Sequence, residues 1–201
     1  MAIPEPPSSF YQKDALDISI DSFAQLENPT ESDLARVATI ASIQAGINRY
    51  RAEAANMSLD ELETEKHNSD RLARHLMATT VPCRRPPRCH AHAIVSGGHK
   101  EAARLRAVLA WLKLRIDDPD NGCWLPENTA ATPHPMFRHA IPHSRIHRFN
   151  YYKWLQTIIT IQNMKTQDRL RTALRLIGKQ LQEHTFPPDV MLPKGQGEFS
   201  R

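Results

Sequence analysis

The chain reads CHAHAIVSGG over residues 89–98, NGCWLP over residues 121–126 and PHSRIHRFNYY over residues 142–152. The first segment is a short apolar run that stops at a glycine pair, which predicts a strand over residues 91–95. The second opens with Asn-Gly, a pair that favours a tight reversal, and predicts a second strand over residues 123–125. The third opens with proline, which suits a first helical turn, and predicts a helix over residues 143–163. The fold is therefore decided here, as two short strands followed by a helix.

Three histidines on these segments form a candidate metal site. His143 and His147 are four residues apart, so on a helix both imidazoles project from one face, about one turn apart. The order of strand, turn, strand and helix can bring His92 onto this pair. Three neutral imidazoles leave metal positions open for water and a phosphate oxygen, which is the arrangement of a catalytic site. His90 shares a strand face with His92 and is a candidate for a ligand or for a group that contacts one.

Composition allows one folded domain, or a domain with an extension. The chain has 201 residues, 40% of them hydrophobic, and a net charge of +4 that is compatible with a polyanionic partner. Seven of its ten histidines lie between His90 and His147. Three cysteines with no Cys-x-x-Cys pair argue against a disulfide framework. The sequence shows neither a signal peptide nor a membrane-spanning stretch, so we expect no membrane association.

Periodic apolar residues predict helical support around the central segments, over residues 31–55, 58–77 and 101–115 and from about residue 168 onward. Thr30 and Ser58 each precede an acidic residue by three positions, which is the pattern of a capping box. We expect residues 1–80 to form a helical arm or docking region, in which residues 1–29 are an extended arm with a short helix near residues 14–26. Residues 81–185 are expected to form the metal module, and residues 186–201 a loose tail.

The ordered motifs resemble the HNH/endonuclease VII superfamily, and within it the branch named for an Ala-His-His signature, the AHH nucleases. The resemblance covers about residues 89–155 and includes Tyr151 and Tyr152. It implies a mostly helical α+β fold, in which a small ββα-metal nuclease module follows a helical N-terminal region. It also implies one divalent metal ion, zinc, magnesium or similar, and metal-dependent hydrolysis of nucleic-acid phosphodiester bonds. DNA is the favoured substrate, with RNA as the alternative.

The resemblance assigns roles by position. It makes His92, His143 and His147 the metal ligands, and it makes Asn121 the residue that orders the loop between strand and helix. The family's general base, which takes a proton from water, falls on Ala93, so Ala-His-Ala stands where Ala-His-His is expected. An alanine methyl cannot accept a proton, which puts the activity of this chain in question.

Three explanations of Ala93 are open. The base was replaced deliberately, since an active toxic nuclease is hard to produce; or the chain is a naturally inactive relative; or His90 acts as base through a shifted register. If only the base is missing, Ala93→His creates or restores activity, by about 10²–10⁴-fold. Arg145 and Arg148 are candidate phosphate contacts, the alternative being ordinary charges on a helix surface.

The resemblance also implies a setting in bacterial competition. Such nucleases are toxins or effectors that are commonly paired with an immunity protein. We expect synthesis in the bacterial cytoplasm and delivery by a specialised secretion system, type VI favoured, with a carrier as a further partner. Two alternatives are not nucleases. One is a binding module in which the three histidines and Cys89 or Cys123 hold a structural zinc ion, and the other is a secretion adaptor in which the histidines are incidental.

Overall fold

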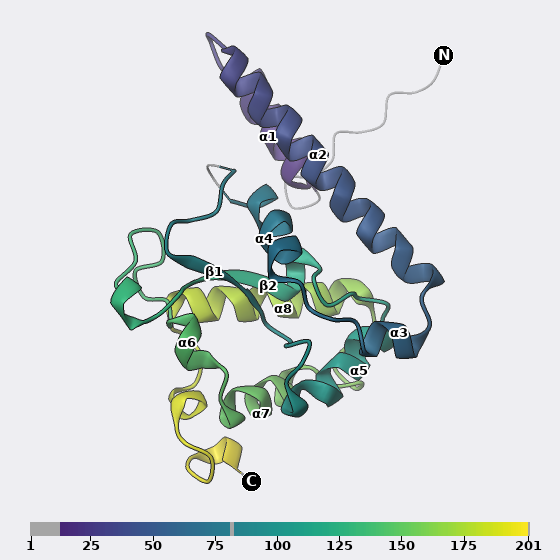
Figure 1. Cartoon of the computed structure of the whole chain (residues 1–201), viewed down its shortest axis with the longest axis vertical. Helices are drawn as coiled ribbons and strands as arrows, with labels where there is room; N and C mark the ends of the chain where they lie inside the picture. Colours follow the sequence, from purple (N-terminus) through teal and green to yellow (C-terminus); the bar gives the residue numbers. More distant parts are fainter. Residues whose placement is uncertain (1–12, 81–82, 201) are drawn as a thin grey trace.

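The structure, a computed structural model, describes residues 13–80 and 83–200. It is a mostly helical α+β fold around one two-stranded sheet, which confirms the predicted fold class (Figure 1). The helices and strands are α1 Ala15–Ala24, α2 Glu31–Glu53, α3 Leu59–Glu63, α4 Ser69–Ala78, β1 Cys89–Ala93, α5 Ala103–Trp111, β2 Gly122–Pro126, α6 His143–Ile146, α7 Phe149–Ile158 and α8 Gln167–Glu183. Short 3-10 turns are η2 Ala54–Asn56, η3 Lys100–Ala102, η4 Pro119–Asn121, η5 Thr129–Ala131, η6 Pro188–Met191 and η7 Glu198–Ser200. The predicted extended arm before residue 13, and Arg201 at the end of the predicted tail, lie outside the described residues.

The sheet gives the two faces of β1 different environments. β1 and β2 pair antiparallel, with His92 opposite Cys123 and Ala93 opposite Gly122. Because side chains alternate along a strand, His90 and His92 share one face while Ala93 points to the other. The His92 face belongs to the main core with α7 and α8, and Cys123 is part of that core.

Helix α4 covers the other face of the sheet (Figure 1). Leu72 of α4 is fully buried and packs in one apolar cluster with Ala91, Ala93 and Trp124. A Cβ atom added to Gly122 would lie 2.7 Å from the Leu72 Cδ1 atom, so a larger residue there would displace the Leu72 side chain. Residues before position 81 are thus in direct contact with the strand that carries His92.

Removing α4 is therefore expected to unfold the metal module. A chain that begins at Pro82 lacks Leu72, so one apolar face of β1 would be exposed to water. We expect this chain to be insoluble or to lack a cooperative thermal transition, whereas a chain that begins at Met57 keeps α4 and serves as control. Circular dichroism and metal titration of both chains make the measurement. A folded, metal-binding chain from Pro82 would support the predicted boundary at residue 81.

The predicted capping boxes are confirmed, and one predicted helix is divided. Thr30 begins α2 and Ser58 begins α3, each with the reciprocal hydrogen bonds of a capping box. The helix predicted over residues 58–77 is two helices, α3 and α4. Asn68 begins the second of them, because its side chain accepts hydrogen bonds from the N–H groups of Asp70 and Arg71.

The Asn-Gly pair does not form the predicted tight reversal. Residues 119–121 form the turn η4, and Gly122 is extended and already belongs to β2. Asp118, only 1% exposed, is ion-paired with Arg51 of α2 and Arg171 of α8. These charges join α2, η4 and α8, so the acidic segment is an internal junction instead of a solvent loop.

The segment predicted as a loose tail contacts the core at several points between Phe186 and Phe199. Val190 is fully buried in the main core. The Asn150 Nδ2 group donates to the carbonyl oxygens of Asp189 and Gln196, each at 2.9 Å, and Arg148 donates to the Met191 carbonyl oxygen. Two polar side chains near the start of α7 thus hold the tail in place.

The N-terminal helices extend away from the sheet. α1 and much of α2 lie side by side and project beyond the body of the molecule (Figure 1). Within the described ranges, no helix is both long and apolar enough to cross a membrane.

Candidate active site

Three imidazoles from two elements meet beside the sheet. His92 comes from β1, His143 is the first residue of α6, and His147 directly follows α6. One ring nitrogen of each lies within 4.8 Å of the others, close enough to hold one metal ion. The ring centroids of His92 lie 5.3 Å from His143 and 5.0 Å from His147. The structure therefore brings together the three residues that the sequence predicts as ligands.

Hydrogen bonds determine which nitrogen of His92 is free. Its Nε2 atom lies 3.1 Å from the Tyr151 hydroxyl, and that hydroxyl donates to the Ile94 carbonyl oxygen at 2.9 Å. Since the hydroxyl proton is already used, the phenol oxygen accepts from His92, which must carry its proton on Nε2. The Nδ1 atom is then an acceptor, and it is buried without a hydrogen-bond partner. An unpaired buried lone pair on a ring whose centroid lies 5.3 and 5.0 Å from two other imidazoles fits a metal ligand.

The other two imidazoles direct their Nε2 atoms at each other. These atoms are 3.2 Å apart, and the His147 Nδ1 atom lies 2.9 Å from the Tyr152 hydroxyl. A proton on Nδ1 bonded to Tyr152 leaves Nε2 of His147 free to bind a cation. Tyr151 and Tyr152 thus orient one ligand each, from adjacent positions of α7.

Helix α6 is a single turn, so the continuous helix predicted over residues 143–163 is wrong. Arg148 is extended and separates α6 from α7. The Arg148 Nε atom donates to the Arg145 carbonyl oxygen at 3.0 Å. In a continuous helix that oxygen would accept from the Phe149 N–H instead. Ile146 is fully buried and anchors the turn. The four-residue spacing still brings His143 and His147 together, because a single helical turn places both imidazoles on one side.

Burial keeps the three imidazoles neutral. It is the main cause that lowers the pKa of His92 far below the usual value, and positive charge on His147 and His143 adds to it. Burial of the ring likewise lowers the pKa of His143 to about 4, and it lowers that of His147 although the residue as a whole is exposed. At neutral pH each ring therefore has a lone pair to offer to a cation.

The family described as a nuclease family of the HNH/ENDO VII superfamily with conserved AHH matches residues 73–181, more than half of the chain. The chain belongs to this family. Nucleases of this superfamily use a divalent metal and act on nucleic acid. No curated protein and no solved structure matches the chain.

The side chain of Asn121 forms hydrogen bonds only to backbone groups of described residues. Its side chain is fully buried, accepts from the Val95 N–H at 2.9 Å, and donates to the carbonyl oxygens of Val95 and Ile116 at 3.2 and 2.8 Å. Its backbone carbonyl accepts from the Ile94 N–H. Asn121 thereby continues the pairing beyond Ala93 and ties β1 to the segment before β2.

Position 93 does not face the ligands. Ala93 is 5% exposed and packs with Leu72 and Trp124 on the α4 side of the sheet. His90, in contrast, lies on the ligand side, with its Nδ1 atom 3.3 Å from Nδ1 of His143. Regular alternation in β1 thus keeps a side chain at position 93 away from the place where the resemblance puts a general base.

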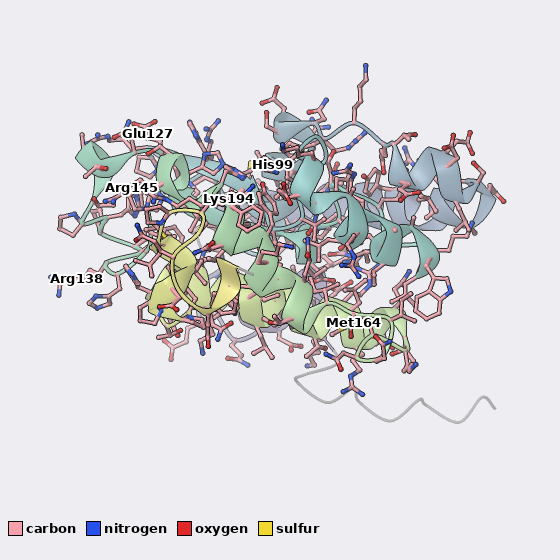
Figure 2. All side chains as sticks on the ribbon, turned by 90° about the horizontal axis from the view of Figure 1, so that it is seen from below. His99, Glu127, Arg138, Arg145, Met164 and Lys194 are labelled. Carbon is pink, nitrogen blue, oxygen red and sulfur yellow. The ribbon has the colours of Figure 1, made fainter. Side chains whose placement is uncertain are left out.

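The two candidate phosphate contacts, Arg145 and Arg148, differ in whether the guanidinium group already forms hydrogen bonds within the protein. Arg148 is half-buried, and its guanidinium is held by the carbonyl oxygens of Arg145 and Met191. Arg145 is exposed and lies at the same end of the molecule as Glu127 and Arg138 (Figure 2). No described residue accepts a hydrogen bond from its side chain, so of the two only Arg145 has a guanidinium available for phosphate.

Neither cysteine joins the ligand group among the described residues. Cys89 is buried on the α4 side of the sheet, where its Sγ atom lies 3.5 Å from the His134 Nε2 atom. Cys123 is buried in the main core, and burial raises the pKa of its thiol. A metal ligand must be a thiolate, so burial works against the closed zinc site proposed as an alternative.

The sequence gives no signal for the roles of Tyr151 and Tyr152, because adjacent aromatic residues on a helix usually indicate core packing. Their roles depend on hydroxyl contacts across 59 positions of sequence for Tyr151 and 5 for Tyr152. Only the contact between Tyr152 and His147 is close enough in sequence to be suggested by the sequence.

Replacing Tyr151 by phenylalanine is expected to weaken metal binding by about 10–100-fold, the usual effect of losing a hydrogen bond to a ligand. The Nε2–H group of His92 would lose its acceptor, so the ring would no longer be held with Nδ1 toward the other ligands. Calorimetric titration with zinc measures the change, and a thermal melt checks that the fold is kept. Equal affinity in Tyr151→Phe and the unmodified chain would contradict the assigned orientation of His92.

Proposed function

We propose that the chain is a metal-dependent endonuclease that hydrolyses phosphodiester bonds, with DNA as the favoured substrate. The observation that carries the proposal is the unpaired, buried Nδ1 atom of His92 beside His143 and His147. A buried polar atom without a partner costs free energy, so the fold holds it ready for a ligand from outside the chain.

A divalent ion bound there would polarise a phosphate oxygen and stabilise the leaving oxygen. Three protein ligands leave part of its coordination shell to water and substrate, as catalytic sites require. Arg145, an exposed residue of α6, would bind a neighbouring phosphate of the strand and so position the reacting one.

Cleavage of plasmid DNA by the chain tests this function. We expect nicked and linear products with added magnesium, manganese or zinc, and none with EDTA. A parallel reaction with a structured RNA determines substrate preference. Cleavage of neither polymer with any of these ions would contradict the proposal and favour the zinc-stabilised binding module or the adaptor.

We propose further that the nuclease serves as an antibacterial toxin, delivered by a specialised secretion system, type VI favoured, and neutralised by an immunity protein. The family match shows a nuclease family, and the role as a toxin goes beyond it to what the sequence resemblance implies. Induced expression in a bacterial host tests it: we expect growth arrest that a small protein encoded beside the gene relieves. Unimpaired growth at high expression would argue against a toxin.

A further inference from the structure

A histidine outside the family match forms a pair with a buried carboxylate. The Nδ1 atom of His67, in the segment between α3 and α4, lies 2.5 Å from the Asp117 Oδ1 atom. Asp117 is fully buried and also accepts from the Asn68 N–H and the Arg71 Nε group. The His67 side chain is 28% exposed, and no described residue bonds its Nε2 atom. The Asp117 carboxylate thus holds a proton on Nδ1 of His67, and the Nε2 atom keeps a lone pair that can accept a proton.

The segment after β1 connects His67 to the three ligands. A Cβ atom on Gly97 would lie 2.8 Å from the His67 Cβ atom, so only glycine permits this approach. Two residues on, the ring of His99 stacks on Tyr152 at 4.3 Å, and Tyr152 bonds His147. His67 therefore packs against the segment that leads from the strand of His92 to His99, the residue that stacks on Tyr152.

We propose that His67, oriented by Asp117, is the general base of this nuclease and replaces the imidazole that Ala93 lacks. The proposal rests on the proposed function. A water molecule gives one proton to the Nε2 atom of His67, and its oxygen forms the new bond to phosphorus. The bond from phosphorus to the leaving sugar oxygen breaks, and that oxygen takes a proton from solvent. The imidazolium is stabilised by the Asp117 carboxylate until it returns its proton to solvent.

His90 is less suited to this task. Its Nδ1 atom lies against His143, and its Nε2 atom is 3.9 Å from the Glu127 carboxylate, too far for a hydrogen bond. Its side chain is 46% exposed, so no buried acceptor determines which nitrogen holds the proton. In His67, by contrast, a buried carboxylate holds the proton on Nδ1, and no described residue forms a hydrogen bond to the Nε2 atom.

Cleavage by the full chain is compared among the unmodified protein, His67→Ala and His67→Asn. The asparagine amide can still donate to Asp117 but cannot take a proton from water, so it separates positioning from base catalysis. We expect both variants to lose about 10²–10⁴-fold in rate. Their zinc affinity, measured by calorimetry, should stay within about threefold of the unmodified chain, because His67 is not a ligand. His139→Ala, an exposed histidine away from the group, is the matched control and should keep full activity.

Two further readouts distinguish a base from a structural residue. Added imidazole should restore part of the rate of His67→Ala and should not accelerate the unmodified chain. If His67 is the base, the cleavage rate of the unmodified chain rises with pH, and this rise should be absent in both variants. The other titratable groups to consider are Asp117, Arg71, His99 and the three ligands. Equal rates in the unmodified chain and both variants would overturn the proposal. So would a loss that imidazole does not rescue, or one that accompanies lost zinc binding.

Failure of the proposed function gives a different pattern. In that case the unmodified chain cleaves neither DNA nor RNA, and the role of His67 is overturned with it. If the unmodified chain cleaves and the His67 variants cleave equally well, only the role of His67 is overturned.

Discussion

Replacing both His143 and His147 by alanine is expected to abolish metal binding and to reduce nucleic-acid cleavage to background. Two of the three imidazoles within 4.8 Å of one another are then lost, and His92 alone remains. The loss of one outer partner of a ligand already costs about 10–100-fold in affinity, so the loss of two direct ligands should exceed that range. The unmodified chain should bind about one divalent ion in a calorimetric titration.

The double variant should keep its fold, which makes the result interpretable. His147 is exposed and His143 half-buried, so neither is part of the apolar core, whereas the neighbouring Ile146 is fully buried and stays in place. A thermal melt checks this, and His139→Ala controls for the loss of a surface histidine. Metal binding that persists in the double variant would refute the ligand assignment.

The ligand set was predictable because each part of it depends on a short stretch of sequence. The pair His143 and His147 needs only one helical turn, and α6 provides only that turn. The apolar run before Gly97 predicts the strand that carries His92, although β1 begins and ends two residues earlier than expected. Short-range patterns thus give the ββα order, while element boundaries shift with the tertiary contacts made at their ends.

What sequence could not show depends on contacts between distant residues. His67 and Asp117 are 50 positions apart, and Arg51 and Asp118 are 67 apart. No periodicity marks such pairs, and an acidic run before Asn-Gly is ordinarily a solvent loop. The same reason explains why α4 was assigned to a separate arm: the packing of Leu72 on β1 has no local signature. The orientation of His92 likewise requires knowing that Tyr151 already donates to Ile94.

Replacing Ala93 by histidine is expected to destabilise the protein without raising its activity. The sequence alone predicts a gain in activity, because the substitution supplies the missing base. In the structure the side chain at position 93 enters the cluster under α4, against Leu72 and Trp124, where Ala93 is only 5% exposed. Overpacking a core costs about 1–3 kcal/mol. Burying imidazole nitrogens without partners costs about 1–3 kcal/mol more.

Urea unfolding of the unmodified chain and of Ala93→His measures the loss in free energy of unfolding. Ala93→Val is the matched control, since it also adds volume but buries no polar group, so its loss should be the smaller one. The cleavage assay on the same proteins decides between the two expectations. A faster Ala93→His enzyme would mean that β1 twists at its end enough to direct position 93 toward His92. In that event the base would lie where the AHH signature places it, and His67 would no longer be needed for proton transfer.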